Sequence, residues 1–363
     1  MRIAILSLYS GHIDRGVETW TREMASRLRK RKNDVLVLQG SDEKIKTDYE
    51  VQVVDIQIIW KYRGGEDNFS QIISWFYWFS LNFSFTLRSI PILVKFKPDI
   101  ILPTNGGIQT LLIKIASLIF GWKIVITGHA GIGAPEKWNL LMRPDIYVSP
   151  SIRGKNWTKN LWFSKGLRIE NIPHGVDLEK FSPGKKDFKL PLERPIILCV
   201  SSLDPFKRVD LAVRAVSKLK KGSLLILGGD REQGVVRDLA KKLLGKERFM
   251  LMKVSPSEIP KYYRNSDLFT LPSNEFEAFG IVYLEALASG LPVVATDDAL
   301  RKEIIRDAGI LVNPEDIDVY AKALEKALKT DWGDKPRNQA KKFSWDKVVK
   351  KYESLFQELT NKV

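Results

Sequence analysis

The feature that most constrains the fold is one structural plan that the sequence repeats, about half a chain apart. Within residues 3–38, an apolar run is followed by a polar loop, an amphipathic segment and a second apolar run. The same order occurs within residues 196–227. Helical spacing of apolar side chains between two buried strands predicts a parallel sheet with crossover helices. Two copies of the plan predict two doubly wound α/β domains.

The remaining apolar runs extend this architecture over the chain. With 363 residues, of which 44% are hydrophobic, the chain can form two cores. Short, mainly apolar runs are typical of buried parallel strands. They occur at residues 100–102, 123–126, 146–148, 268–271 and 293–295.

The domain boundaries are predicted from composition. Residues 181–195 are rich in proline and charge and lack periodicity, which predicts a linker between domains at 1–180 and 196–345. Ser344 is a predicted N-cap for a final helix, residues 346–363. Ligands of doubly wound sheets bind beyond the carboxyl ends of the strands. We therefore expect the functional residues in loops after strands, in a cleft where both sets of loops meet.

Composition bounds the cellular setting and the partners. The single cysteine, Cys199, cannot form an internal disulfide, which favours a reduced, cytoplasmic location. No signal peptide is predicted at the start of the chain, and the apolar segment at 72–87 is interrupted by polar residues, so we expect no membrane span. The net charge of +15 fits nucleic acid, an anionic membrane or phosphorylated substrates, and equally well lysine-rich helix surfaces.

Two carboxylates after a predicted strand form the strongest candidate site. Glu277 lies in the loop after the run at 268–271, and Glu285 lies on the helix that starts near Gly280. A helix N-terminus suits a phosphate, and a carboxylate can accept two hydrogen bonds from a sugar diol. Spacing alone also fits a helix start with two solvated glutamates, so the chemistry stays open at this point.

The sequence around these carboxylates resembles a known family. Residues 272–296 resemble the glutamate–seven–glutamate signature of retaining GT-B glycosyltransferases of family 4. Residues 172–181, 198–215 and 343–346 resemble further segments of that family, in the expected order. The resemblance spans nearly the whole chain and is most specific from about residue 171. It implies the GT-B fold, with the final helix crossing back onto the N-terminal domain, and transfer of a sugar from a sugar nucleotide.

The resemblance implies roles for individual residues of the C-terminal domain. Glu285 is expected to hold the nucleotide ribose, and Glu277 to bind hydroxyls of the donor sugar. Lys207 is expected to pair with the diphosphate, where a cation stabilises the charge that develops as the glycosidic bond breaks. The base is expected near Lys253 and Val254. Backbone amides expected to meet the sugar and phosphates are those of Phe279, Gly280 and Ile281.

In the N-terminal domain the resemblance implies two site residues. His129 is expected near the anomeric carbon, and Gly16 in a loop that approaches the phosphates. A histidine after a strand is more often structural when taken alone. Its glycine-rich surroundings, which we interpret as a flexible loop at a strand end, favour the functional interpretation.

The phosphate loop departs from the family pattern. The family has Gly-Arg-Leu where this chain has Ser201-Ser202-Leu203, while Lys207 is kept. A serine cannot supply the charge of an arginine fork. We therefore hypothesise that Arg208 substitutes for it, and the departure puts the donor's identity in doubt.

No metal or cofactor is expected. Asp316 and Asp318 match a metal-binding pattern, but they precede an amphipathic segment, so an N-capping role is favoured. Arginines and lysines crowd the segment 22–32, and aromatic residues crowd the segment 75–85. Together they suggest that the N-terminal domain contacts anionic lipid, although a helix packed on the sheet beside a solvated basic patch explains them as well.

These observations combine into one functional prediction. We expect a retaining glycosyltransferase that moves a hexosyl group from a UDP- or GDP-sugar to a hydroxyl of a carbohydrate or lipid-linked acceptor, at the inner face of a membrane. The alternatives are a degenerate, non-catalytic partner, a basic nucleic-acid-binding protein and, with less support, a sugar-nucleotide epimerase.

Overall fold

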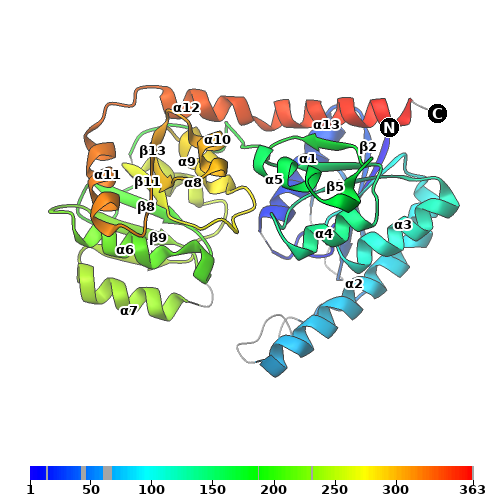
Figure 1. Ribbon diagram of the computed structural model, residues 1–363, viewed down its shortest axis with the longest axis horizontal. Coiled ribbons are helices and arrows are strands. Elements are labelled where there is room, and N and C mark those ends of the chain that lie inside the picture. Colours follow the sequence, from blue (N-terminus) through cyan, green and yellow to red (C-terminus); the bar gives the residue numbers. More distant parts are fainter. Residues whose placement is uncertain (14, 42–45, 60–67, 187, 230–231, 362–363) are drawn as a thin grey trace. The chain divides into compact units, whose positions relative to one another are not determined.

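Two separate parallel sheets organise the chain (Figure 1). The computed structural model describes residues 1–13, 15–41, 46–59, 68–186, 188–229 and 232–361, with only the backbone at 68–71. The chain divides into one unit of Met1–Pro173 with Val348–Val363 and a second unit of His174–Lys347. The predicted pair of doubly wound α/β domains is confirmed.

The first unit contains a seven-stranded sheet in the order β3-β2-β1-β4-β5-β6-β7. All neighbouring strands are parallel, so their carboxyl ends share one edge of the sheet. The strands are β1 (Arg2–Leu6), β2 (Asp34–Gly40), β3 (Glu50–Val54), β4 (Ile100–Pro103), β5 (Lys123–Thr127), β6 (Ile146–Ser149) and β7 (Ile169–Asn171).

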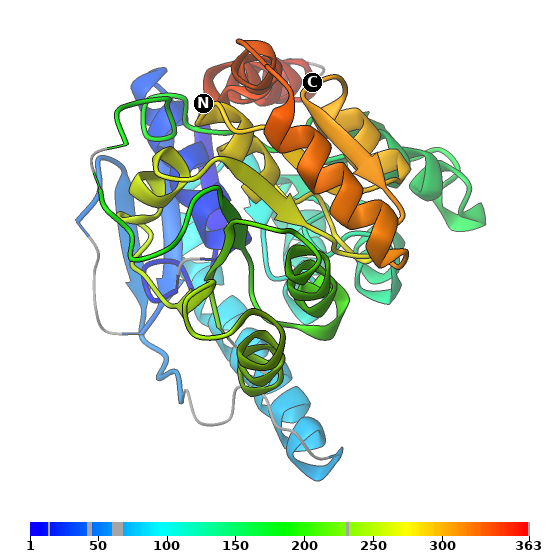
Figure 2. The ribbon, with the colours of Figure 1, turned by 90° about the vertical axis from the view of Figure 1, so that its left-hand side faces the viewer.

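Helices cover both faces of this sheet. They are α1 (Gly16–Lys30), α2 (Asn68–Phe96), α3 (Ile108–Phe120), α4 (Ala134–Leu141) and α5 (Ile152–Lys159). α1 lies on one face with the C-terminal part of α13 (Trp345–Thr360), while α2 and α3 pack together on the other face (Figures 1 and 2). The basic segment therefore lies on α1 and the aromatic segment on α2, on opposite faces of the sheet.

The second unit contains a six-stranded parallel sheet in the order β10-β9-β8-β11-β12-β13. Its strands are β8 (Ile196–Val200), β9 (Ser223–Leu227), β10 (Phe249–Met252), β11 (Leu268–Leu271), β12 (Val293–Thr296) and β13 (Gly309–Val312). Every residue of β8, β9 and β11 is buried, as expected for strands that are covered on both faces.

The helices of the second unit also form two layers. α6 packs with α7 on one face, and α9, α10 and α12 pack together on the other (Figure 1). The helices of this unit are α6 (Val209–Ser217), α7 (Gln233–Leu244), α8 (Ile259–Arg264), α9 (Ile281–Ala288), α10 (Ala299–Ile305), α11 (Ile317–Lys329) and α12 (Lys335–Ala340).

The predicted linker and the final helix occupy defined places. Apart from residue 187, which lies outside the described residues, the segment 181–195 belongs to the second unit, with Phe181 and Leu190 in its core. α13 begins after Ser344 and joins the first unit from Val348 onward. There the Tyr352 hydroxyl lies 2.9 Å from the Thr127 hydroxyl, so the end of the chain helps to build the first domain. Among the described residues, no helix has the length and apolarity that a membrane span requires.

Candidate active site

Two loops at the carboxyl edge of the second sheet bring the predicted donor residues together. β8 pairs with β11, so the segments that follow these two strands are neighbours. The amide of Asn274 donates to the carbonyl of Phe206 over 2.9 Å and joins the two segments directly. The first segment carries Lys207 and the second carries Glu277, which places both where ligands of doubly wound sheets bind.

Lys207 and Glu277 form an ion pair. The Lys207 ammonium lies 2.6 Å from a Glu277 carboxylate oxygen, and their side chains are 14% and 9% exposed. The ammonium also lies 4.9 Å from the centre of the Phe206 ring. When a phosphate binds, the Lys207 ammonium can exchange its contact with the Glu277 carboxylate for a hydrogen bond to the phosphate. This exchange is possible because both side chains lie within reach of the loop surface. The sequence predicted these two residues for one site, and the structure places them in contact.

The N-terminus of α9 lies beside this pair. Gly280 precedes the helix with φ of +81°, and a Cβ atom there would lie 2.5 Å from the Tyr283 ring. Only glycine fits this position without strain. Phe279 is buried against His174, with ring centres 5.1 Å apart, and fixes the approach to the helix. In α9 the amide of Tyr283 already donates to the Gly280 carbonyl, over 3.0 Å. The amides of Ile281 and Val282 precede this first bond of the helix and can bind an anion.

Glu285 lies one turn into α9 and is partly buried. The Tyr263 hydroxyl donates to its carboxylate over 2.9 Å. Burial raises the pKa of Glu285 from 4.5 to about 7, and the Tyr263 hydrogen bond and the charge of Lys180 act in the opposite direction. A carboxyl group with this pKa can accept hydrogen bonds from a diol when ionised and donate one when protonated.

Arg208 is engaged with the loop that carries Glu277. Its Nε donates to the Pro272 carbonyl over 2.8 Å, and another nitrogen forms a 3.0 Å ion pair with Glu315. A third nitrogen lies 3.3 Å from the Thr296 hydroxyl. The hypothesis that Arg208 replaces the family's phosphate-loop arginine requires these contacts to break. Ser202, at the replaced position, donates to Asp204 over 2.7 Å.

Arg301 supports the same loop and was missed by the sequence reasoning. Its side chain is 0% exposed and pairs with Asp298. Its guanidinium donates to the carbonyls of Ser273 and Asn274, over 3.0 Å each. An arginine inside a short helix has no local signal for this role, because the loop that it holds lies 27 residues earlier in the chain.

The predicted base-binding residues follow β10. The Lys253 side chain lies across Gly229, where a Cβ atom would approach the lysine Cε to 2.0 Å. Val254 packs against the core of the second unit. Both residues lie at the same carboxyl edge as Lys207, two strands away in the sheet.

In the first unit, His129 and Gly16 lie after β5 and β1. His129 meets Trp20 of α1 edge to face, with ring centres 5.0 Å apart. Gly16 is exposed at the start of α1, with no atom within 4 Å of the place where a Cβ would be. α1 therefore brings Gly16, at its start, and Trp20, one turn later, to the edge where His129 lies.

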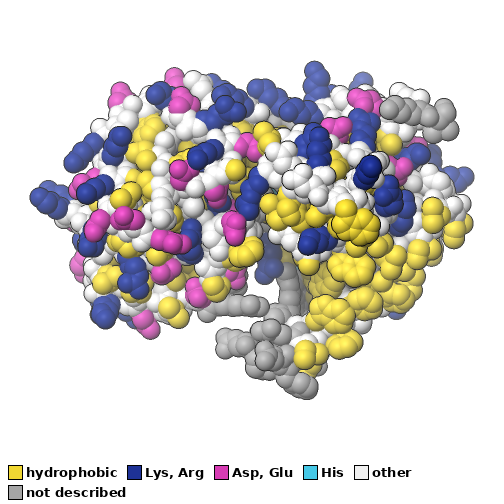
Figure 3. Space-filling view, in the orientation of Figure 1, with side chains coloured by type: hydrophobic (Ala, Val, Ile, Leu, Met, Phe, Trp, Pro, Cys, Tyr) yellow, Lys and Arg dark blue, Asp and Glu magenta, His cyan; other side chains and the backbone are white. Residues whose placement is uncertain are grey.

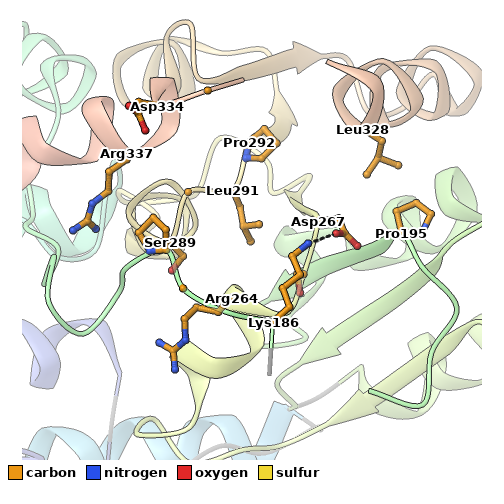
Figure 4. A pocket seen from close by; sticks show the side chains of 15 residues that line it. Lys186, Pro195, Arg264, Asp267, Ser289, Leu291, Pro292, Leu328, Asp334 and Arg337 are labelled. Atoms are coloured by element: carbon orange, nitrogen blue, oxygen red, sulfur yellow. Dashed lines mark hydrogen bonds and ion pairs between the residues drawn. The ribbon is translucent and has the colours of Figure 1, made fainter. Parts of the chain in front are cut away.

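A cavity of about 500 Å³ lies at the opposite edge of the second sheet (Figure 4). Among the residues that line it, Pro195, Asp267 and Pro292 directly precede β8, β11 and β12. Asp267 pairs with Lys186 and accepts a 2.7 Å hydrogen bond from the Ile196 amide. These contacts attach the segment before β8 to the sheet, and the predicted donor residues do not line this cavity.

The predicted capping role of Asp316 is confirmed. Its carboxylate accepts a 3.0 Å hydrogen bond from the Val319 amide at the start of α11. Asp318 points to Lys218, with 3.2 Å between the charged atoms. Within the described ranges, no cluster of three or more His, Cys, Asp or Glu side chains could hold a metal ion.

Two family models match the chain, one for each unit. The model described as "Glycosyl transferases group 1" matches residues 183–344. The model described as "Glycosyltransferase Family 4" matches residues 15–180. Together they cover every predicted site residue and all strands of the two sheets except β1.

Curated relatives match about half of the chain. A D-inositol 3-phosphate glycosyltransferase of Mycolicibacterium smegmatis is 33% identical over 198 residues, which cover 50% of this chain and 45% of that protein. A GDP-mannose-dependent alpha-(1-6)-phosphatidylinositol monomannoside mannosyltransferase of the same organism is 30% identical over 186 residues, covering 46% and 48%. Each match spans less than half of the relative's own length.

Solved structures match the whole chain at low identity. A sucrose-phosphate synthase from Thermosynechococcus elongatus has a TM-score of 0.80 at 19% identity, covering 100% of both chains. HepE from Anabaena, solved in complex with UDP and glucose, has a TM-score of 0.74 at 18% identity, covering 98% of this chain and 99% of that one. At these identities the likeness shows a shared fold, which confirms the GT-B architecture.

Proposed function

Because the chain belongs to the group 1 glycosyltransferases, with an N-terminal half of the family 4 type, we propose that it moves a hexosyl group from a nucleoside-diphosphate sugar to a hydroxyl acceptor with retention of the anomeric configuration. One observation carries the proposal. The Lys207–Glu277 pair, with 2.6 Å between its charged atoms, lies at the carboxyl edge of the second sheet beside the start of α9. A cation, a carboxylate and a helix N-terminus together suit a sugar diphosphate.

The residues of this edge divide the work of donor binding. The Lys207 ammonium and the first amides of α9 meet the diphosphate and stabilise its charge as the glycosidic bond breaks. Glu277, once the phosphate attracts Lys207, accepts hydrogen bonds from the sugar hydroxyls. Glu285 accepts from the ribose diol, and Lys253 and Val254 line the place of the base. For the first unit, the proposed roles are that Gly16 binds the phosphates and that His129 acts at the anomeric carbon.

The donor class follows from the relatives. One curated relative is named as GDP-mannose-dependent, and one protein of the same fold was solved with UDP and glucose. We therefore take a UDP- or GDP-hexose as the donor. The proposed reaction uses no cofactor, because Lys207 and the N-terminus of α9 stabilise the negative charge of the departing diphosphate.

We propose that the acceptor is at a membrane and that an apolar face of the first unit binds this membrane. We define the apolar face as the exposed hydrophobic side chains of α2, α3 and α4 (Figure 3). Trp75 and Phe76 on α2 are 57% and 61% exposed, Leu118 on α3 is 77% and Trp138 on α4 is 59% exposed. Contiguous apolar surface of this extent marks an interaction site. Exposed basic side chains on and just after α4, at Lys137 and Arg143, add attraction to anionic lipid headgroups.

Vesicle flotation tests the membrane placement. With vesicles of anionic and neutral phospholipid at physiological salt, we expect the chain to float and the triple variant Trp75→Ser, Phe76→Ser, Leu118→Ser to bind roughly tenfold less. Val235→Ser is a matched control, because Val235 is 66% exposed on α7 of the other unit. Equal binding by all three proteins, or no binding by the wild type, contradicts the placement.

Release of nucleotide from a panel of UDP-, GDP- and ADP-sugars tests the reaction. We expect slow hydrolysis of one donor, lost in Lys207→Ala and in Glu277→Ala. Analysis of the released sugar by NMR before mutarotation then reports the anomer and so the retention. If the folded protein turns over no donor, the alternative of a degenerate, non-catalytic partner is favoured. The observation behind this alternative is that Ser202 stands where the family has the phosphate-loop arginine. Strongly salt-dependent binding to DNA or RNA would support the nucleic-acid alternative instead.

A further inference from the structure

A buried carboxylate in the first unit has no place in the chemistry above. Glu136 lies in the first turn of α4 and is 1% exposed. Burial raises its pKa, while hydrogen bonds from its neighbours act in the opposite direction. Burying a carboxylate is costly unless hydrogen bonds compensate it. Its retention in this core therefore calls for a local function.

The Glu136 carboxylate accepts hydrogen bonds from a backbone amide and from two side chains. One oxygen accepts from the Ala130 amide over 2.8 Å. The other accepts from the Tyr147 hydroxyl over 3.0 Å and from the Asn139 side-chain amide over 3.1 Å. Ala130 directly follows His129 in the chain. The carboxylate thus holds the backbone of the loop that carries His129, and a set made only of donors matches an ionised acid.

The partners of Glu136 are themselves held in place. Asn139 accepts a 3.1 Å hydrogen bond from the Thr110 hydroxyl of α3, which orients its amide nitrogen toward the carboxylate. Tyr147 lies so close to Gly128 that a Cβ atom there would be 2.2 Å from the tyrosine oxygen. Gly128 is therefore needed for close packing against Tyr147.

The imidazole is supported from the other side by α1 and α13. His129 packs on Trp20, and Trp20 packs on Tyr352 with ring centres 5.9 Å apart. The polar support beneath the loop and the aromatic support beside the ring together fix both the backbone and the side chain of residue 129. A group that acts at a reacting centre needs this kind of preorganisation.

We propose that Glu136 is a positioning residue for His129: its carboxylate holds the Ala130 amide, and so sets the direction in which the imidazole faces the anomeric carbon. The inference rests on the proposed function of His129. Glu136 itself touches no substrate. The substitution Glu136→Gln keeps a side chain of similar shape, but the new amide nitrogen presents hydrogens to a donor in place of an oxygen, so at least one of the three hydrogen bonds is lost.

Kinetics of Glu136→Gln test the proposal. We expect kcat for donor hydrolysis to fall about tenfold with the KM for the donor unchanged within twofold, because the change acts at the reacting centre and not at the diphosphate. Tyr147→Phe, which removes one of the three donors, is expected to lower kcat about threefold. Glu170→Gln is the matched control, since Glu170 is a partly exposed carboxylate of the same unit, paired with Arg168. A rise in KM with unchanged kcat overturns the proposal.

A double variant separates positioning from general damage. If Glu136 acts through His129, the variant His129→Ala with Glu136→Gln is no slower than His129→Ala alone, within twofold. Losses that multiply overturn the proposal.

Amide hydrogen exchange gives a readout that does not depend on activity. We expect residues 128–133 to exchange at least tenfold faster in Glu136→Gln, with the rest of the first unit unchanged. Wild-type exchange in this segment overturns the proposal. If His129→Ala keeps full activity, the proposed function of His129 fails, and the exchange result still decides whether Glu136 holds the loop.

Discussion

The carboxyl edges of the two sheets are built with different chemistry. At the second sheet, a lysine and a glutamate are in contact beside a helix N-terminus, and two arginines support the loop that carries the glutamate. At the first sheet, an imidazole packs on an indole, above a carboxylate that accepts only from uncharged donors. The charged edge of the second sheet suits an anionic leaving group. At the first sheet the carboxylate of Glu136 is buried beneath the loop, and the rings of His129 and Trp20 suit a sugar ring. The same strand topology therefore provides two different surfaces, and the loops after the strands make the difference.

The largest effect is expected at the charged edge. Lys207→Ala should lower kcat by roughly 10² to 10³, as for removal of one group that stabilises developing charge. Lys207→Arg should recover part of the loss, because the charge is restored in another geometry. Steady-state donor hydrolysis measures both. A loss in Lys207→Ala no greater than that in His129→Ala would break the distinction between the two edges.

Removal of the buried arginine should lower both stability and activity. In Arg301→Met, Asp298 loses its ion-pair partner and the carbonyls of Ser273 and Asn274 lose their donors. We expect a loss of about 3 kcal/mol in the free energy of unfolding, as for breaking a buried pair. Urea denaturation measures it. Arg214→Met is the control, since Arg214 is exposed on α6, and it should change stability by less than about 0.5 kcal/mol.

His174 should make the second unit less stable in acid. Burial lowers its pKa from 6.5 to about 4, so between these values the unfolded chain binds the proton and the folded chain does not. The stabilisation from this residue is complete above pH 6.5 and is lost as the pH falls toward 4, with a total of about 3 kcal/mol. NMR of the imidazole gives the pKa directly. A His174 that titrates near 6.5 in the folded protein would contradict this account.

Glu285 should have the opposite pH dependence and a smaller effect. Its pKa is raised to about 7, so its contribution is complete below pH 4.5 and is lost as the pH rises through 7. At pH 8, Glu285→Gln should therefore have a free energy of unfolding about 1–2 kcal/mol higher than the wild type, once the partial exposure of Glu285 is allowed for. Near pH 4.5 the two proteins should be equally stable, and urea denaturation at both pH values measures the difference. The same variant should bind the donor more weakly. A destabilised Glu285→Gln at pH 8 would refute the assignment of a buried, costly charge at this position.

Short-range patterns allowed the fold to be predicted, whereas the residues of the charged edge were predicted from the family resemblance. The site residues that follow β8, and those between β11 and the first turns of α9, lie close in sequence to the strand that positions them. The family resemblance assigned Lys207 and Glu277, 70 residues apart, to one site. The structure places them in contact because β8 and β11 are neighbours in the sheet.

The features that sequence reasoning missed depend on packing between distant elements. Arg301 and Glu136 carry no local signal, since each is defined by loops that reach it from another part of the fold. The burial that raises the pKa of Glu136 could not be anticipated from a carboxylate in the first turn of a helix, which is normally solvated. For the same reason the sequence did not indicate that the sheet separates the basic helix α1 from the aromatic helix α2.

Binding of UDP and GDP measured by calorimetry tests the central claim most directly, that the donor occupies the carboxyl edge of the second sheet. Lys207→Ala is compared with Lys186→Ala, which removes a lysine at the opposite edge of the same sheet. We predict that one nucleotide binds, that Lys207→Ala weakens it at least tenfold and that Lys186→Ala leaves it unchanged. Weaker binding in Lys186→Ala, with Lys207→Ala unaffected, would place the nucleotide at the other edge and contradict the account.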